Sequence, residues 1–180
     1  AQQQWDIAEA SYRRAAERRP SAAEPLLALV QMDMRRGKLT SAQTRLEQLL
    51  AHSPDHPYAS GLLGELLMTK GETATAVSHF NTATHLNPKW ITPWIHLARI
   101  RYGQTQMEEG DTALRRGLEL NPDNEQMRLM FAISLAAQRH YDEAIGQYEL
   151  VLRRAPSSLL AANNLAALLV DQKGDTQSLE

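Results

Sequence analysis

The chain has 180 residues and a formal net charge of −2, with 43% hydrophobic and only 6% aromatic residues. This composition is typical of a helix-rich globular protein, and it lacks the basic excess expected of proteins that bind nucleic acid or anionic membranes. The absence of cysteine excludes disulfides, thiolate catalysis and cysteine-ligated metal centres. No apolar run approaches the roughly 20 residues that are needed to span a bilayer.

Five prolines give the sequence a regular period of 34 residues. They are Pro20, Pro54, Pro88, Pro122 and Pro156. A fixed period of this length indicates a repeat architecture. Each proline removes a backbone donor and disfavours helical geometry in the residue before it, so each is expected to follow the end of a helix.

The segments between the prolines each divide into two predicted helices. In chain order these span 1–19, 21–36, 40–52, 57–70, 73–86, 90–104, 107–120, 124–138, 141–154 and 157–173. Pro25 fits the first turn of its helix, where no N–H is needed, and Gly37 ends that helix. Thr40 or Ser41 can cap the next one. Gly110 and Gly117 each cost roughly 1 kcal/mol relative to alanine, so 107–120 is expected to be the least stable helix.

Aligning the sequence on the prolines reveals columns of constant side-chain size. One column is small in every copy: Ala8, Ala42, Ala76, Gly110 and Ala144. A second is also small: Val30, Gly64, Ala98, Ala132 and Ala166. A third is large and apolar: Leu29, Leu63, Leu97, Phe131 and Leu165. Small residues let two helices approach where they cross, and large residues fill the space beside the crossing.

This pattern resembles the tetratricopeptide repeat, and segment 57–88 matches it best. The matching residues are Leu63, Gly64, Ala76, Phe80, Ala83 and Pro88, and the next repeat adds Trp94. The resemblance implies an all-α fold, a right-handed superhelical solenoid of antiparallel helix pairs. It predicts the second helix of a truncated repeat over 1–20, four repeats over 21–54, 55–88, 89–122 and 123–156, and the first helix of a truncated or capping repeat over 157–180. We therefore expect the chain to be part of a longer array.

Two charged residues depart from the family pattern. Asp33 and Arg101 occupy a position where the family has a half-buried aromatic residue. A charge at such a position needs a partner or an exposed route for its polar end.

The sequence contains no recognisable catalytic or metal-binding motif. None of the six histidines, at positions 52, 56, 79, 85, 96 and 140, has the spacing of a metal site. We therefore expect no enzyme activity, no cofactor and no metal. The paired arginines 18–19, 115–116 and 153–154 fall in the last turns of predicted helices, where the helix dipole favours cations. We prefer the helix dipole, rather than phosphate binding, as the explanation for these arginine pairs.

The family resemblance also implies a concave groove, lined by the first helix of each repeat, in which partners are bound. The positions that would line it are Leu27, Gln31, Met34, Arg35, Tyr58, Leu62, Glu65, Met68, Ile95, His96, Arg99, Tyr102, Leu129, Met130, Ile133, Asn163 and Asn164. Methionines adapt to irregular partners, and an exposed apolar strip often marks an interaction site. Packing between neighbouring first helices explains Leu62, Ile95, Leu129 and Ile133 equally well. Met34, Met68, Tyr58 and Tyr102 are favoured as accessible to a ligand.

The sequence thus predicts a non-enzymatic scaffold that binds a partner peptide or helix, with a resemblance to bacterial arrays in envelope or exopolysaccharide assembly. One alternative is the substrate-recruiting arm of a larger enzyme, such as a glycosyltransferase. Another is self-assembly into a homo-oligomer through the terminal helices. Neither nucleic-acid binding nor direct membrane insertion is expected. The sequence does not distinguish a location in the bacterial periplasm or envelope from one in the cytoplasm.

Overall fold

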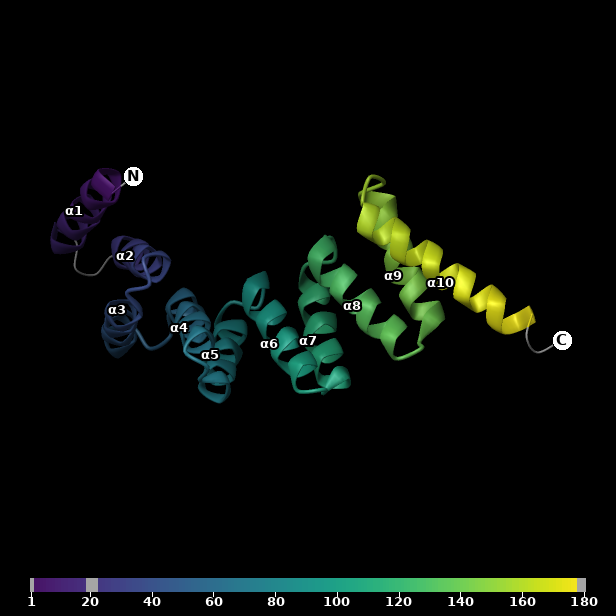
Figure 1. The fold of residues 1–180 in the computed structure, drawn as a ribbon. Helices are drawn as coiled ribbons and strands as arrows, with labels where there is room; N and C mark the ends of the chain where they lie inside the picture. The colour runs from purple at the N-terminus through teal and green to yellow at the C-terminus, as the bar shows by residue number, and fades with distance from the viewer. Residues whose placement is uncertain (1, 19–22, 178–180) are drawn as a thin grey trace. The chain divides into compact units, whose positions relative to one another are not determined.

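The computed structural model describes residues 2–18 and 23–177, with side chains placed for 4–18 and 23–170. Within these residues the chain is entirely helical and forms ten α-helices (Figure 1). They are α1 (Gln2–Arg18), α2 (Ala23–Arg35), α3 (Leu39–His52), α4 (Pro57–Thr69), α5 (Thr73–Leu86), α6 (Ile91–Gly103), α7 (Met107–Leu120), α8 (Glu125–Ala137), α9 (Tyr141–Arg154) and α10 (Leu159–Gln177). Among the described helices, none has the length and apolar character needed to cross a membrane.

The chain divides into two compact units, residues 1–93 and 94–180. In the first unit each of the helices α1 to α4 packs against the next along the chain, so that the series ends with α4 on α5. Its core contains members of the predicted columns: Leu29 and Val30 of α2 and Ala42 of α3 are buried, and Leu46 of α3 is buried as well. Gly64 of α4 faces the ring of Phe80 on α5, and a Cβ at Gly64 would lie 2.8 Å from Phe80 Cε1. The predicted close crossing of two helices at a small residue is confirmed there.

In the second unit α7 packs on α8, α8 on α9, and α9 on α10, while α8 and α10 also touch directly. Phe131, Ala132, Ala144 and Tyr148 are buried in the core of this unit. Gly117 of α7 allows close approach by Trp94 of α6 and Met127 of α8, because a Cβ there would lie 2.8 Å from the methionine sulfur. Gly117 of α7 is therefore required by packing, although glycine has a low intrinsic helix propensity. The low stability predicted for this helix stays a prediction.

The predicted helix boundaries agree with the structure to within a few residues, apart from those that fall on 1 and 19–22, which lie outside the described residues. The predicted cap of α3 is wrong. This helix begins at Leu39 after Lys38, with no side-chain cap, and the Ser41 hydroxyl instead donates to Asp33 Oδ2 at 2.6 Å. Capping by side chains occurs on α4 and α8, where His56 and Asn124 accept a backbone N–H.

The two charges that depart from the family pattern both have partners. Asp33 is buried, and its carboxylate also pairs with Arg45 Nε at 3.0 Å, in addition to Ser41. Arg101 donates through Nη1 to Gln106 Oε1 at 2.9 Å. The expectation that such charges need partners is confirmed, and the ion pair of Asp33 with Arg45 links α2 to α3.

Candidate partner-binding surface

In the first unit, the predicted binding positions lie on α2 and α4 and differ widely in exposure. Gln31, Arg35 and Tyr58 are exposed, whereas Leu62 is only 8% exposed and belongs to the core. The remaining positions are half-buried: Leu27, Met34, Glu65 and Met68. The apolar side chains of these positions that are at least partly exposed are thus Leu27, Met34, Tyr58 and Met68.

Tyr58 is held in place although 46% of it is exposed. Its ring lies against Trp90, with centroids 4.8 Å apart, and its hydroxyl accepts a hydrogen bond from Asn87 Nδ2 at 3.4 Å. The Trp90 ring in turn covers Gly61, where a Cβ would lie 2.2 Å from Trp90 Cη2. Glycine is therefore needed at this position of α4. The aromatic pair presents Tyr58 to solvent in a fixed orientation.

In the second unit, the four predicted positions on α6 also differ in exposure. Ile95 is 7% exposed and buried, Arg99 is exposed, and His96 and Tyr102 are half-buried. Burial raises the pKa of the Tyr102 hydroxyl well above its usual range, and hydrogen bonding to Asp111 adds to this effect. Tyr102 is therefore a neutral hydrogen-bond donor at any physiological pH.

Tyr102 is the first member of a buried polar network that joins three helices. Its hydroxyl donates to Asp111 Oδ1 on α7 at 2.7 Å, and Gln138 Nε2, immediately after α8, donates to Asp111 Oδ2 at 2.7 Å. The same amide lies 3.1 Å from Ser134 Oγ. Asp111 and Ser134 are both buried, so their polar groups depend on these partners. The network gives Tyr102 a structural role in addition to any contact with a ligand.

The remaining predicted positions lie on α8 and α10. Ile133 is 44% exposed, and Leu129 and Met130 beside it on α8 are half-buried. Asn163 is exposed, whereas Asn164 is half-buried and its side chain hydrogen-bonds to Tyr148. That bond opposes the effect of burial, which raises the pKa of the Tyr148 hydroxyl. The Asn164 amide is thus engaged in packing between α9 and α10.

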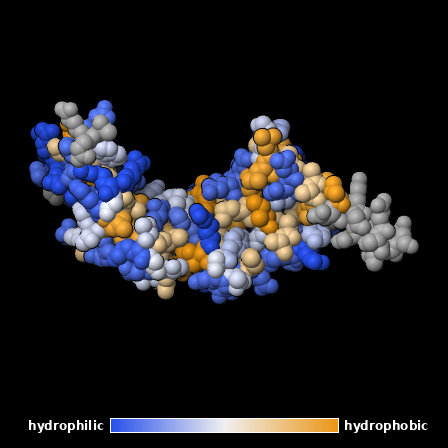
Figure 2. Space-filling model, viewed as in Figure 1, coloured by the Kyte–Doolittle hydropathy of each residue, from blue (hydrophilic) through white to orange (hydrophobic). Residues whose placement is uncertain are grey.

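Further exposed large apolar side chains lie on α10, and hydrophobic patches are visible in this part of the molecule in Figure 2. These side chains are Leu159, Leu160, Leu169 and Val170.

No cluster of three or more histidine, aspartate or glutamate side chains within the described part of the chain is placed to hold a metal ion.

The model of the tetratricopeptide repeat family matches residues 27–89, 96–158 and 129–178, which together make up most of the chain. The chain belongs to the tetratricopeptide repeat family. Tetratricopeptide repeats are protein-interaction modules, and arrays built of them alone are typically non-catalytic. No match to the chain was found among the curated proteins.

Several solved tetratricopeptide repeat structures resemble this array. A thermophilic protein of Thermus thermophilus is 22% identical, with 92% of this chain and 91% of that one covered and a TM-score of 0.66. YrrB, described as having an unusual peptide-binding site, is 20% identical over 90% of this chain and 84% of its own, with a TM-score of 0.71. A protein from Parabacteroides merdae is 20% identical over 97% of this chain and 70% of its own, with a TM-score of 0.70. At these identities the likeness concerns the fold alone.

Sequence reasoning missed the polar network of this tetratricopeptide repeat array. The column of Ser134 is otherwise apolar and buried, with Met32, Leu66, Ile100 and Leu168 in the other copies. Gly110, next to Asp111, is the only glycine in its column and lies under the Tyr102 ring. Both departures were visible in the sequence, but only the structure shows that they meet.

Proposed function

We propose that this tetratricopeptide repeat array binds a partner peptide or helix on the exposed faces of its first helices, α2, α4, α6, α8 and α10. The observation that carries the proposal is the exposure of Ile133 on α8, at 44%. Leu129 and Met130 lie four and three residues before it, respectively, and therefore share its side of the helix. An apolar side chain this exposed, with a flexible methionine beside it, is suited to burial by a partner.

The partner is an apolar or amphipathic segment with polar flanks. Tyr58 offers a rigid aromatic anchor on the first unit, a residue type that is enriched among the contacts that dominate interfaces. Arg99 and Asn163 are exposed polar groups on first helices of the second unit and would form the edge of the surface. The peptide-binding site described for YrrB supports a peptide as the occupant. A role in bacterial envelope or exopolysaccharide assembly, and attachment to a larger enzyme, stay predictions from the sequence.

The test selects peptides from a random displayed library on the wild-type protein and measures their affinity for single variants. Ile133→Glu is expected to weaken binding of peptides that use the second unit by about tenfold or more, because it places a charge where apolar surface is buried. Leu120→Glu is the matched control, since Leu120 is 42% exposed in the same unit but lies on the second helix α7. Circular dichroism verifies that both variants are folded.

The proposal fails if the selected peptides bind Ile133→Glu as tightly as the wild type, or if Leu120→Glu weakens them equally. Tyr58→Ala provides the corresponding test in the first unit. Tyr102 is unsuitable as a probe, because its replacement also removes a donor from buried Asp111.

The exposed apolar residues of α10 favour self-association as a second candidate function. If this helix mediates it, light scattering will show a molecular mass that rises with protein concentration, and Leu159→Glu will abolish the rise. A monomeric mass at all concentrations would exclude it.

A further inference from the structure

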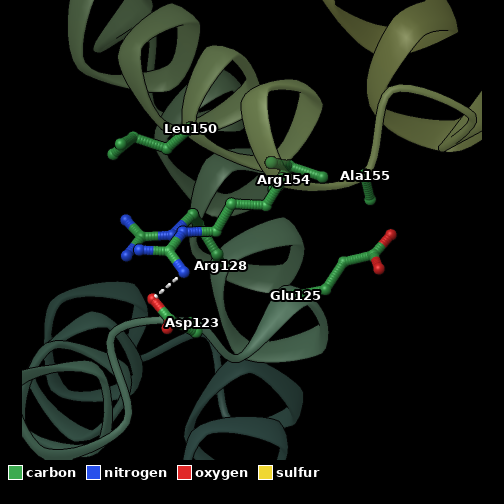
Figure 3. Close-up of a pocket in the computed structure, with 7 residues that line it drawn as sticks. Asp123, Glu125, Arg128, Leu150, Arg154 and Ala155 are labelled. Atoms are coloured by element: carbon green, nitrogen blue, oxygen red, sulfur yellow. Dashed lines mark ion pairs between the residues drawn. The ribbon is translucent and has the colours of Figure 1, made fainter.

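A cavity of about 200 Å³ lies in the second unit between the start of α8 and the end of α9 (Figure 3). Its charged lining residues are Asp123, Glu125, Arg128 and Arg154, and Leu150 forms an apolar wall. No position of the proposed peptide-binding surface lines this cavity. It is therefore a separate feature of the molecule.

Two guanidinium groups line the cavity, that of Arg128 from α8 and that of Arg154 from α9. They overlap in the view of Figure 3, and the charge of Arg154 acts on Arg128. Arg154 Nη1 pairs with Asp123 Oδ1 at 2.5 Å. Glu125 points away from the arginines, and its Oε1 accepts a hydrogen bond from Ser158 at 2.7 Å. The carboxylate that faces the guanidinium groups is thus that of Asp123, while Glu125 keeps its charge on the side turned away from them.

The position of Arg128 is electrostatically unfavourable. It lies in the first turn of α8, where the positive end of the helix dipole opposes a cation. Partial burial lowers the pKa of its guanidinium, and the charge of Arg154 lowers it further, while Asp123 opposes the shift. Arg128 also donates to Gln147 Oε1 at 2.6 Å and to the carbonyl oxygen of Pro122. These neutral acceptors orient the guanidinium but do not neutralise it.

The repeat pattern does not require either arginine. At the position of Arg128, the three preceding repeats have Leu26, Ser60 and Trp94. At the position of Arg154 the four preceding second helices have Arg18, His52, Leu86 and Leu120. The helix dipole accounts for Arg154, as the sequence suggested, but it opposes Arg128. Residues that break local rules in this way are expected at functional sites.

We propose that this cavity binds an oxyanion, the carboxylate or phosphate group of a ligand, between Arg128 and Arg154. The planar guanidinium group donates two parallel N–H bonds to such oxygens, and two of them can hold one anion from neighbouring sides. A bound oxyanion places its negative charge between the two guanidinium groups. Asp123 competes with it for Arg154.

Inorganic phosphate is the probe, titrated into the wild-type protein at constant ionic strength with chloride as the comparison. Binding is followed by isothermal calorimetry and by the arginine side-chain Nε–H signals in NMR spectra. Arg154→Gln is expected to weaken phosphate binding by about tenfold or more, since it removes a charge-assisted contact. Its matched control is Arg153→Gln, which removes the adjacent arginine that does not line this cavity and is expected to leave binding unchanged.

Asp123→Asn is the decisive variant, because it removes the internal competitor and keeps both arginines. Phosphate binding is expected to tighten by about tenfold, a gain that misfolding cannot produce. A parallel titration with acetate shows whether the cavity prefers carboxylate or phosphate geometry. The proposal is overturned if phosphate shows no saturable effect beyond that of chloride, if Asp123→Asn fails to tighten binding, or if Arg153→Gln weakens it as much as Arg154→Gln.

Discussion

Gly110 and Gly146 occupy the interiors of second helices α7 and α9, yet alanine should have opposite effects at the two positions. A Cβ at Gly110 would lie 2.3 Å from Tyr102 Cε1 and 2.6 Å from Cδ1, whereas a Cβ at Gly146 would meet nothing within 4 Å. Alanine at Gly146 should therefore stabilise the protein by about 1 kcal/mol through helix propensity alone. The same gain applies at Gly110, but there it is opposed by the ring.

The Tyr102 ring cannot retreat freely, because its hydroxyl is bound to buried Asp111 at 2.7 Å. If the ring stays, overpacking costs about 1–3 kcal/mol. If it swings away, a hydrogen bond to a charged group worth about 1.5–3 kcal/mol is lost. After subtracting the propensity gain of about 1 kcal/mol, about 0–2 kcal/mol of this cost is left, so we expect Gly110→Ala to destabilise the protein by up to about 2 kcal/mol.

Urea unfolding followed by circular dichroism measures both changes, with the second unit giving the signal of interest. The informative comparison adds Gly110→Ala to a Tyr102→Ala background, where the obstructing ring is gone. There the glycine substitution should become stabilising by about 1 kcal/mol, which gives a coupling free energy between the two sites. Equal stabilisation by Gly110→Ala and Gly146→Ala in the wild-type background would refute the reasoning, because it would show that the ring does not constrain the helix.

Three further predictions concern other parts of the fold. Gly71 has φ of +81° with open space around it, so Gly71→Ala should lower the free energy of unfolding by about 1 kcal/mol through backbone strain alone, measured by urea unfolding. Asp33→Asn should lower it by about 1–3 kcal/mol in the same assay, because the buried pair with Arg45 loses its charge. Burial lowers the pKa of His79, so the unfolded chain binds a proton there more readily and stability should fall as the pH drops through 6.5. This loss should be smaller in His79→Gln, and equal losses in the two proteins would contradict the assignment.

The arrangement of helices could be predicted from the sequence because the same information recurs in every repeat. The prolines mark the ends of second helices, and the small columns mark the crossings, as Gly64 against Phe80 confirms. Every copy of the repeat has the same local geometry, so a helix position that is ambiguous in one copy can be assigned from the others. The capping of α3 was predicted wrongly because Ser41 has a stronger acceptor in Asp33, which lies on another helix.

The candidate surface and the polar network could be predicted only in part. A column identifies which residues occupy the outer side of a first helix, but not how deeply the neighbouring helix covers them. Leu62 and Ile133 were equally ambiguous in the sequence, and the structure buries one and exposes the other. The network of Asp111 depends on residues from three helices, and a repeat pattern reports departures at single positions without pairing them in space.

Two polar contacts in the second unit hold α8. At its start, Arg128 is bound to Gln147 of α9, and just after its end Gln138 is bound to Asp111 of α7. The helix that carries Ile133 is therefore held near both ends by polar contacts whose geometry is directional. Directional contacts fix the rotation of a helix more tightly than apolar packing, which tolerates small shifts. A surface held in this way loses little conformational freedom when a partner binds, which increases the affinity obtained from a small apolar contact.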